Sequence, residues 1–299
     1  MKLALKIDVD TFRGTKEGVL PLLSLLEKNG AEATFLFSLG KDHTGWALKR
    51  AFKPGFMKKV SRTSVLQHYG LKTLLYGTLL PGPDIGKRCR NLMKSVMDAG
   101  FETGIHTHDH VKWQNNVAEA DEEWTSREMR AAFDRFEEIF GGPAHVHGAA
   151  GWQMNRHAFR LTQKLGFSYA SDTRGRSPFV PVQNAEIIAC PQLPTTLPTL
   201  DEIMGIEEDA SSHLLKISEN PEPTGHVYTL HAELEGMKLI GLFEKLLHGW
   251  KAMGYELVSL KTYFDSLNER DLPRHEVIYG EIPGRAGKLA MQGAAFLTD

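Results

Sequence analysis

The sequence of 299 residues contains only two cysteines and no long apolar run. Cys89 and Cys190 do not have the spacing of a disulfide framework or of a thiolate zinc site, which fits a reducing compartment. Two aspartates lie within the first ten residues, too early for the apolar stretch of a signal peptide. No later run approaches the roughly 18 apolar residues of a membrane span. We therefore expect a cytoplasmic chain.

The sequence also lacks a glycine-rich phosphate loop after any predicted strand, and it lacks internal repeats. The first absence argues against a nucleotide-binding sheet. The formal net charge is only −2, and no nucleic-acid recognition motif is present. We therefore predict no nucleic-acid partner.

Short apolar runs alternate with amphipathic stretches along most of the chain. This alternation predicts an α/β fold with a parallel sheet, either a barrel or a doubly wound sheet. With 41% hydrophobic residues, the chain can form one domain over residues 1–299, although the glycine-rich tail 272–299 is weakly patterned. Strands are predicted at Leu3–Ile7, Ala33–Ser38, Phe101–Ile105, Ala144–His147, Phe167–Ser171, Ala185–Ala189, Val227–His231 and Tyr255–Ser259. Helices are predicted at Lys16–Lys28, Ile85–Ala99, Ser126–Phe140, Asn155–Leu165 and Met237–Met253.

Positive charge is concentrated in residues 41–90. That segment has a balance of +9, so the rest of the chain sums to −11. Its lysines and arginines are interleaved with aromatic and aliphatic residues such as Trp46 and Phe52. This pattern is typical of a surface that faces an anionic partner, for example an acidic membrane surface, and the alternative is a solvated basic face.

Asp8 and Asp10 directly follow the first apolar run. Strand alternation places both carboxylates on one side if the strand continues, and close carboxylates repel unless a cation lies between them. The alternative role for either residue is the N-cap of a following helix. The polar residues at the ends of several other strands favour the barrel, in which strand ends converge on one active site.

Three histidines occur within five residues, at His106, His108 and His110. Histidines four apart share a face of a helix, whereas all three share a face of an extended strand. Imidazole nitrogens are common ligands of zinc and similar divalent metals, so we predict a metal site, although the spacing does not decide which pair binds. The alternative is a hydrogen-bonded polar cluster.

His231 ends an apolar run, and Asp172 follows another. Alone, each is more often a structural residue than a catalytic one. As a pair they would gain a function, because an aspartate can orient an imidazole and stabilise its protonated form.

Six segments, in this order, resemble the NodB-type polysaccharide deacetylase superfamily. The resemblance is closest to one branch, the 4-deoxy-4-formamido-L-arabinose-phosphoundecaprenol deformylases. It implies a distorted (β/α) barrel with the basic segment 41–90 inserted. The matching segments are IDVDTFRGT at 7–15, GIHTHDH at 104–110, AAGW at 149–152, SDTRG at 171–175, LPTLDE at 197–202 and YTLHAELEG at 228–236.

The resemblance also implies roles for individual residues. It assigns Asp8 as general base, His231 as general acid and Asp172 as the residue that orients His231. It assigns one divalent metal ion, Zn, Co or Mn, to Asp10, His106 and His110. The superfamily's third motif normally supplies an arginine that tethers the base, but residues 147–153 contain none. We expect Arg13 or Arg174 to replace it.

The implied reaction is metal-dependent hydrolysis of the formamide of an undecaprenyl-phosphate-linked amino sugar, in the lipid A modification that gives polymyxin resistance. Such a substrate would bring the enzyme to the inner-membrane surface, and the segment 41–90 would be its docking element. One alternative is a deacetylase or cyclic-amide hydrolase acting on a soluble substrate. The other is a metal-binding membrane adaptor without catalytic activity.

Overall fold

The computed structural model describes residues 1–47, 70–220, 222, 224–283, 285 and 287–297. The predicted basic segment is therefore described only in part, since its residues 48–69 lie outside the described residues. In the part of the chain that the structure describes, no helix is both long and apolar enough to cross a membrane.

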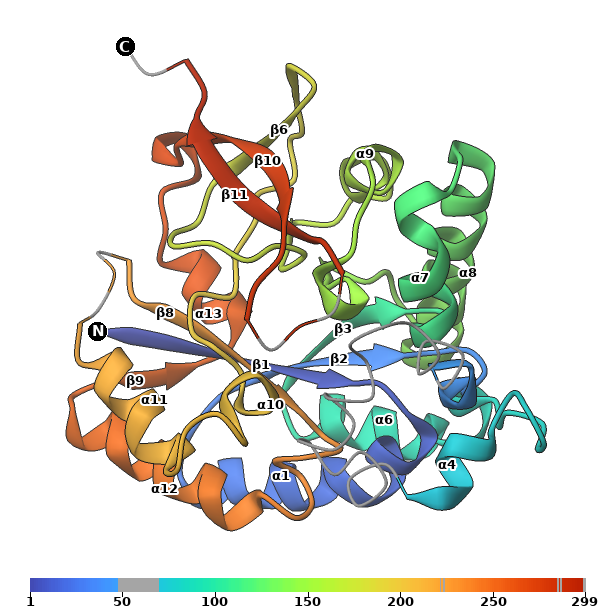
Figure 1. Ribbon diagram of the computed structural model, residues 1–299, viewed down its shortest axis with the longest axis horizontal. Coiled ribbons are helices and arrows are strands. Elements are labelled where there is room, and N and C mark those ends of the chain that lie inside the picture. Colours follow the sequence, from blue (N-terminus) through green and yellow to red (C-terminus); the bar gives the residue numbers. More distant parts are fainter. Residues whose placement is uncertain (48–69, 221, 223, 284, 286, 298–299) are drawn as a thin grey trace.

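A parallel sheet forms the centre of the molecule. Its strands follow the order β5-β4-β3-β2-β1-β8, and β9 pairs with the first half of β1 (Figure 1). In this register Asp8 lies opposite His231 on one side and Leu36 on the other. The strands are β1 Lys2–Val9, β2 Thr34–Ser38, β3 Glu102–Thr107, β4 Val146–His147, β5 Tyr169–Ala170, β8 His226–His231 and β9 Glu256–Val258.

An extended segment, Gln192–Thr196, bridges the two end strands of this sheet. Leu193 N donates to Ala170 O at 2.8 Å, and Thr196 N donates to Val227 O at 3.0 Å. The segment therefore hydrogen-bonds to β5 on one side and to β8 on the other. It closes the sheet into the predicted distorted barrel, which is confirmed.

Strand alternation in β1 separates the helix side of the sheet from the barrel interior. Leu3, Leu5, Ile7 and Val9 belong to the main hydrophobic core with the helices. Ala4 belongs to a second apolar cluster, inside the barrel. The next side chains on the interior face are those of Lys6 and Asp8, so the interior changes from apolar to charged toward the C-terminal end of β1.

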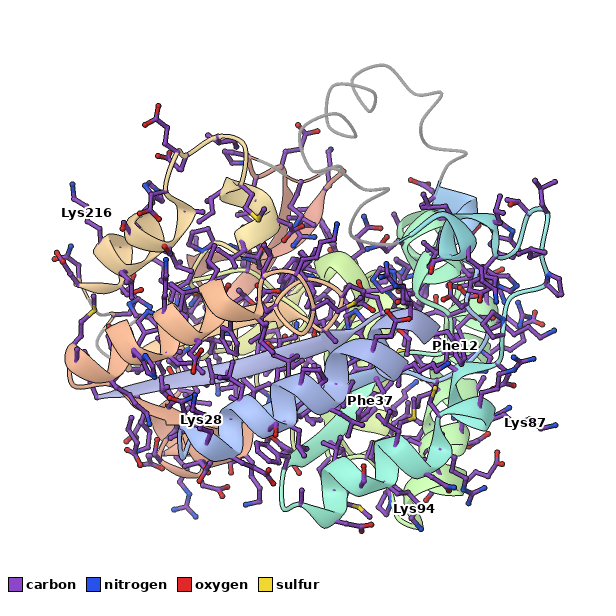
Figure 2. All side chains as sticks on the ribbon, turned by 90° about the horizontal axis from the view of Figure 1, so that it is seen from below. Phe12, Lys28, Phe37, Lys87, Lys94 and Lys216 are labelled. Atoms are coloured by element: carbon purple, nitrogen blue, oxygen red, sulfur yellow. The ribbon has the colours of Figure 1, made fainter. Side chains whose placement is uncertain are left out.

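Helices cover the outside of the barrel. In Figure 1, α1, α6 and α12 lie along one side of the sheet. Phe37 of β2 is buried in the core with these helices, whereas Lys28, Lys94 and Lys216 point outward (Figure 2). The main helices are α1 Val19–Lys28, α6 Arg90–Asp98, α8 Glu122–Phe140, α9 Arg156–Lys164, α11 Ala210–Ser218 and α12 Ile240–Ala252. Shorter elements are η1 Gly14–Gly18, α4 Leu71–Leu75, α5 Ile85–Arg88, α7 His110–Asn116, η3 Val117–Glu119, η4 Ala150–Trp152, α10 Leu200–Ile203, α13 Leu260–Asp265 and η5 Glu269–Asp271.

A second sheet, in the order β11-β10-β6-β7, lies on the other side of the barrel sheet from these helices (Figure 1). The run predicted as a strand at Ala185–Ala189 does not enter the barrel. Asn184 and Ala185 have φ values of 51° and 62°, which form a tight hairpin turn, so the run pairs back antiparallel to the preceding strand. The unassigned tail supplies two paired strands of this sheet. Its strands are β6 Val180–Gln183, β7 Glu186–Ile187, β10 Arg274–Gly280 and β11 Leu289–Ala295.

Candidate active site

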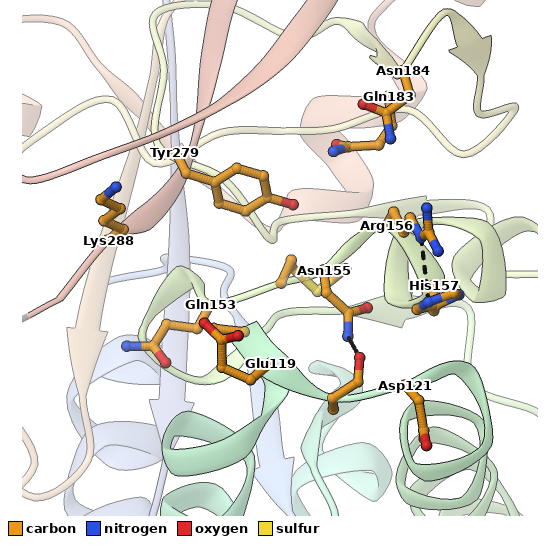
Figure 3. A pocket seen from close by; sticks show the side chains of 13 residues that line it. Glu119, Asp121, Gln153, Asn155, Arg156, His157, Gln183, Asn184, Tyr279 and Lys288 are labelled. Atoms are coloured by element: carbon orange, nitrogen blue, oxygen red, sulfur yellow. Dashed lines mark hydrogen bonds between the residues drawn. The ribbon is translucent and has the colours of Figure 1, made fainter.

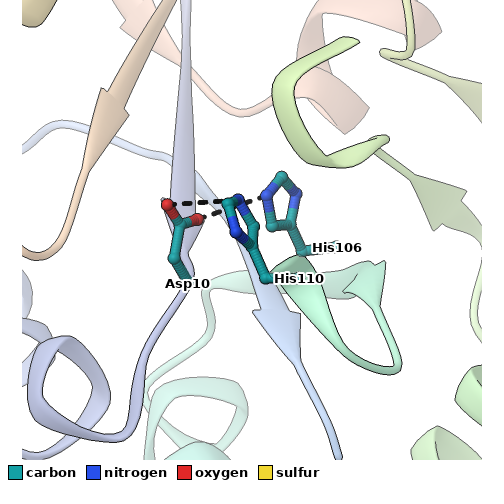
Figure 4. A group of neighbouring side chains, drawn as sticks. All are labelled: Asp10, His106 and His110. Carbon is teal, nitrogen blue, oxygen red and sulfur yellow. Dashed lines mark ion pairs between the residues drawn. The ribbon is translucent and has the colours of Figure 1, made fainter. Parts of the chain in front are cut away.

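Three of the predicted residues form a compact group at the C-terminal ends of β1 and β3. The ligand atoms of Asp10, His106 and His110 all lie within 4.8 Å of one another (Figure 4). The Asp10 carboxylate is 3.2 Å from Nε2 of His106 and 3.3 Å from Nε2 of His110. Asp10 follows a strand, His106 lies on a strand and His110 begins a helix, so segments almost 100 residues apart supply one site.

The change from strand to helix after His106 decides which histidines meet. Asp109 caps α7, because its Oδ1 accepts a hydrogen bond from Lys112 N at 3.0 Å. The helix therefore begins at His110 and turns that imidazole back toward His106, with ring centroids 5.2 Å apart. His108 instead lies against Gly40, where an added Cβ would be 2.7 Å from the His108 ring.

The buried polar atoms of this group fit a cation. Oδ1 of Asp8, Oδ1 of Asp10 and both ring nitrogens of His106 are buried and have no hydrogen-bond partner among the described residues. Buried polar atoms are normally satisfied, so such a cluster requires an explanation. A divalent ion coordinated by Asp10 and two imidazoles would satisfy Oδ1 of Asp10 and one ring nitrogen of His106, since these groups are ordinary ligands of such ions.

The electrostatics of the group are consistent with an ionised carboxylate. Burial alone would raise the pKa of Asp10, but the imidazoles of His110 and His106 outweigh it and hold that pKa well below its ordinary value. Burial also lowers the pKa of His106, whereas the Asp8 and Asp10 carboxylates raise it, and the raising effect prevails.

Asp8 lies one layer deeper than Asp10 in the barrel. Its Oδ1 is 3.6 Å from Nδ1 of His106, and its Oδ2 is 3.4 Å from Nζ of Lys6. Among the described residues, Lys6 is thus the basic residue that pairs with Asp8. The two arginines expected there have other partners, since Arg13 pairs with Glu17 and Arg174 pairs with Glu202.

His231 ends β8, the strand next to β1, and lies directly opposite Asp8 in the register. Its Nδ1 is 3.9 Å from Oδ1 of Asp201 and its backbone N donates to Oε2 of Glu235 at 3.0 Å. The carboxylate of Asp201 is itself held by Thr199, whose hydroxyl donates at 2.5 Å, and by Arg285 from the tail at 3.0 Å.

Asp172 does not contact His231. Its Oδ1 is 2.7 Å from Nδ1 of His147 and accepts a hydrogen bond from Ala149 N at 2.8 Å. The reason is topological: Asp172 follows β5 and His231 ends β8, and the segment Gln192–Thr196 separates these two end strands. The structure therefore corrects the expected pairing and places Asp201 beside His231.

Sequence reasoning also missed two glutamates that follow His231. Oε1 of Glu233 accepts hydrogen bonds from the backbone N of Asp10 at 3.1 Å and of Thr11 at 2.8 Å. Glu235 accepts one from the backbone of His231 at 3.0 Å. Glu233 therefore joins the turn after β8 to the end of β1, and Glu235 holds the end of β8 itself. The available signal was two acidic residues directly after an apolar strand.

The structure also has a cleft of about 610 Å³ (Figure 3). Its walls include Glu119 of η3, Asn155 before α9, Asn184 of the β6–β7 turn, Tyr279 of β10 and Lys288. None of the lining residues belongs to the Asp10, His106 and His110 group.

Comparison with known proteins assigns this arrangement to a family. The model of the polysaccharide deacetylase family matches residues 7–170, which include Asp8, Asp10 and all three histidines of the second motif. The chain belongs to the polysaccharide deacetylase family. The predicted resemblance is thus confirmed, and members of this family are amide hydrolases, so the chain is a hydrolase that acts on an amide bond.

Relatives cover almost the whole chain. The chain is 37% identical over 295 residues to a protein of Shewanella sediminis (strain HAW-EB3), an alignment that covers 98% of this chain and 95% of that protein. It is 33% identical over 283 residues to a protein of Wigglesworthia glossinidia brevipalpis, with 93% and 98% covered. Both are named "Probable 4-deoxy-4-formamido-L-arabinose-phosphoundecaprenol deformylase ArnD".

The family fold is also found in solved structures. The crystal structure of a protein assigned to the polysaccharide deacetylases of Mycobacterium smegmatis superposes with a TM-score of 0.65, covering 94% of each chain at 16% identity. At this identity the likeness concerns the fold alone, and it agrees with the distorted barrel described above.

Proposed function

We propose that this chain removes the formyl group from undecaprenyl-phosphate-linked 4-deoxy-4-formamido-L-arabinose, using one divalent metal ion. The products are formate and the lipid-linked 4-amino sugar, whose place is in the lipid A modification associated with polymyxin resistance. The observation that carries the proposal is the grouping of Asp10, His106 and His110 next to Asp8, which itself lies opposite His231 on the neighbouring strand, in a chain whose relatives bear that enzyme's name.

The proposed mechanism divides the work between the two sides of the site. When bound by Asp10, His106 and His110, the ion supplies a Lewis acid for the amide carbonyl and for water. Asp8 takes the proton of the attacking water. His231 donates a proton to the nitrogen, because an amine is a poor leaving group until it is protonated. The C–N bond breaks and the oxygen of water stays on the formyl carbon as formic acid, which ionises to formate. Asp8 releases its proton and His231 takes one up, so the enzyme is regenerated and both protons of water are accounted for.

Mass spectrometry of the lipid-linked formamido sugar tests this proposal directly. Wild-type protein loaded with Zn²⁺, Co²⁺ or Mn²⁺ is expected to produce a species lighter by the mass of CO, together with free formate. Asp8→Asn protein is the matched control. Turnover of a water-soluble N-acetyl amino sugar at an equal or higher rate would instead favour the deacetylase on a soluble substrate.

We also propose that residues 41–90 dock the enzyme on the anionic face of the inner membrane from the cytoplasm. The support is the sequence balance of +9 in an otherwise acidic chain, since cations near an anionic surface contribute about 1 kcal/mol each. Charge reversal at Lys49, Arg50, Lys53, Lys58 and Lys59 should release the protein from anionic vesicles in a flotation assay. Hydrolysis of a short-chain soluble analogue should persist, and flotation equal to wild type would contradict the proposal.

A further inference from the structure

A lysine occupies a position inside the barrel where a small apolar residue would be ordinary. The side chain of Lys6 has no exposed surface, and it follows Ala4 of the interior apolar cluster along the same face of β1. Removing an ammonium group from water costs several kcal/mol unless the charge is paired and its hydrogen bonds are made. The barrel therefore contains a specific environment for this charge.

Three groups form that environment, from β1 itself, from the residue after β5 and from η4. Nζ of Lys6 donates to Ser171 O at 3.1 Å and lies 3.4 Å from Oδ2 of Asp8. It also lies 5.2 Å from the centroid of the Trp152 ring, within the range of a cation–π contact. The three N–H bonds of the ammonium thus have a carbonyl, a carboxylate and an aromatic face available.

The opposite wall of the barrel leaves room for the lysine stem. A Cβ added to Gly148, directly after β4, would lie 3.0 Å from Cε of Lys6 and 2.4 Å from a methyl carbon of Leu36. Trp152 adopts φ 53°, a backbone conformation that costs free energy in residues other than glycine. Both features bring the segment after β4 close around Lys6.

We propose that Lys6 is the positioning residue of Asp8. It holds Oδ2 of the carboxylate and balances its charge, while Oδ1 has no hydrogen-bond partner in the part of the chain that the structure describes. The superfamily's third motif normally supplies this charge as an arginine, and Arg13 or Arg174 was expected in its place. Here a positive charge reaches the carboxylate from β1, two residues before it. The inference rests on the proposed function, in which Asp8 is the general base.

The test replaces the charge while keeping the length of the side chain. Lys6→Met is expected to lower kcat by roughly 10- to 100-fold with KM and bound metal unchanged, because the base loses its orientation but the metal ligands remain. Lys6→Arg should recover much of the rate. Lys2→Met is the matched control, since Lys2 lies on the same strand and pairs with Glu256 at 3.3 Å, away from the site.

A double-mutant cycle separates positioning from mere stabilisation. If Lys6 acts through Asp8, then adding Lys6→Met to Asp8→Asn should leave the residual rate unchanged. The same cycle applies to thermal unfolding: Lys6→Met alone should lower Tm by roughly 5–10 °C because it leaves a buried carboxylate unpaired, and Asp8→Asn should remove most of that loss.

Two results would overturn the inference. One is a Lys6→Met enzyme whose kcat lies within about threefold of the wild-type kcat, because a base that lost its positioning residue should lose more than that. The other is a Lys6→Met effect that is equally large in the Asp8→Asn background, which would indicate a general structural role. If Asp8→Asn itself retains wild-type activity, the proposed function fails instead, and the two failures are thereby distinguished.

Discussion

The two sides of the candidate active site are built differently. Asp8, Asp10 and His106 lie on or next to parallel strands, and each has at most 6% of its surface exposed. On the other side His231 also ends a strand, but its neighbour Asp201 comes from the short helix α10. That aspartate is 26% exposed in its side chain and is held by a residue of the C-terminal tail.

This difference has consequences for function. A ladder of backbone hydrogen bonds fixes the strand residues, so the position of the proposed base and of the proposed ligands Asp10 and His106 depends on the fold itself. The proposed acid side depends on side-chain contacts between the short helix α10 and the tail. Substitutions in the metal and base side should therefore have large effects, and substitutions around His231 should have smaller, graded ones.

The largest effect is expected from removing metal ligands. His106→Ala or His110→Ala should abolish both metal binding and turnover, because each removes one of three ligands, and chelation should do the same to wild type. His108→Ala is the matched control and should keep both. Metal content by elemental analysis, together with turnover, measures the outcome. Loss of metal in His108→Ala but not in His110→Ala would reverse the assignment.

A smaller but still large effect is expected from the two groups that are proposed to move protons, Asp8 and His231. Asp8→Asn and His231→Ala should keep the fold and the metal but lower kcat by about 10²-fold or more. Circular dichroism, metal content and steady-state kinetics are compared for each variant. Near-normal kcat in His231→Ala would remove that residue from the mechanism.

The two aspartates that compete for the role of orienting His231 sharpen the comparison further. Asp201→Asn should lower kcat by about 10-fold, because Asp201 lies 3.9 Å from Nδ1 of His231. Asp172→Asn should act mainly on stability, since its buried carboxylate holds His147 and the backbone of Ala149. Kinetics and urea unfolding of both variants decide between them. The opposite pattern would restore Asp172 as the partner of His231.

The tail should contribute a weaker effect. Arg285→Met removes the hydrogen bond to Asp201 and should lower kcat by roughly two- to fivefold, with metal content unchanged. Arg270→Met, an exposed arginine in the same part of the chain, is the control. An effect of Arg285→Met as large as that of His231→Ala would mean that the acid side is as rigid as the base side.

The smallest effect concerns how the free energy of unfolding changes with pH. Burial raises the pKa of the Glu235 carboxyl from 4.5 to about 7, so the folded state keeps a proton that the unfolded state loses. Stability should therefore fall as pH rises from about 4.5 to 7, by at most about 3 kcal/mol for this group. Urea unfolding across this range should show a smaller fall for Glu235→Gln. Equal slopes would contradict the buried, protonated carboxyl.

Much of the base side could be predicted from the sequence, because strand periodicity is local. The alternation of Asp8 and Asp10 after an apolar run indicated two carboxylates on one face, and β1 extends through Val9 as this requires. The choice of His106 and His110 over His108 could not be made from spacing. It depends on the cap at Asp109, which turns the chain from strand to helix after the first histidine.

The remaining errors have different causes. The expected pairing of Asp172 with His231 ignored the segment that lies between β5 and β8, and this could not be detected without knowing which strands are neighbours. The expected tether, Arg13 or Arg174, was sought among arginines, whereas Lys6 lies in a strand that looked like ordinary apolar core. Strand alternation alone places Lys6 and Asp8 on one face, so this second pair could have been found in the sequence.

The sequence by itself determined the class of fold, the family and the residues from which the proposed metal site and base are drawn, because these depend on local periodicity and on short motifs. Only the tertiary structure decided which distant residues meet. Asp201 with His231 and Glu233 with the backbone of Asp10 are pairs that strand order and barrel closure bring together. Inside a barrel, a charge must find its partner across the interior, and that distance is set by the packing of the strands.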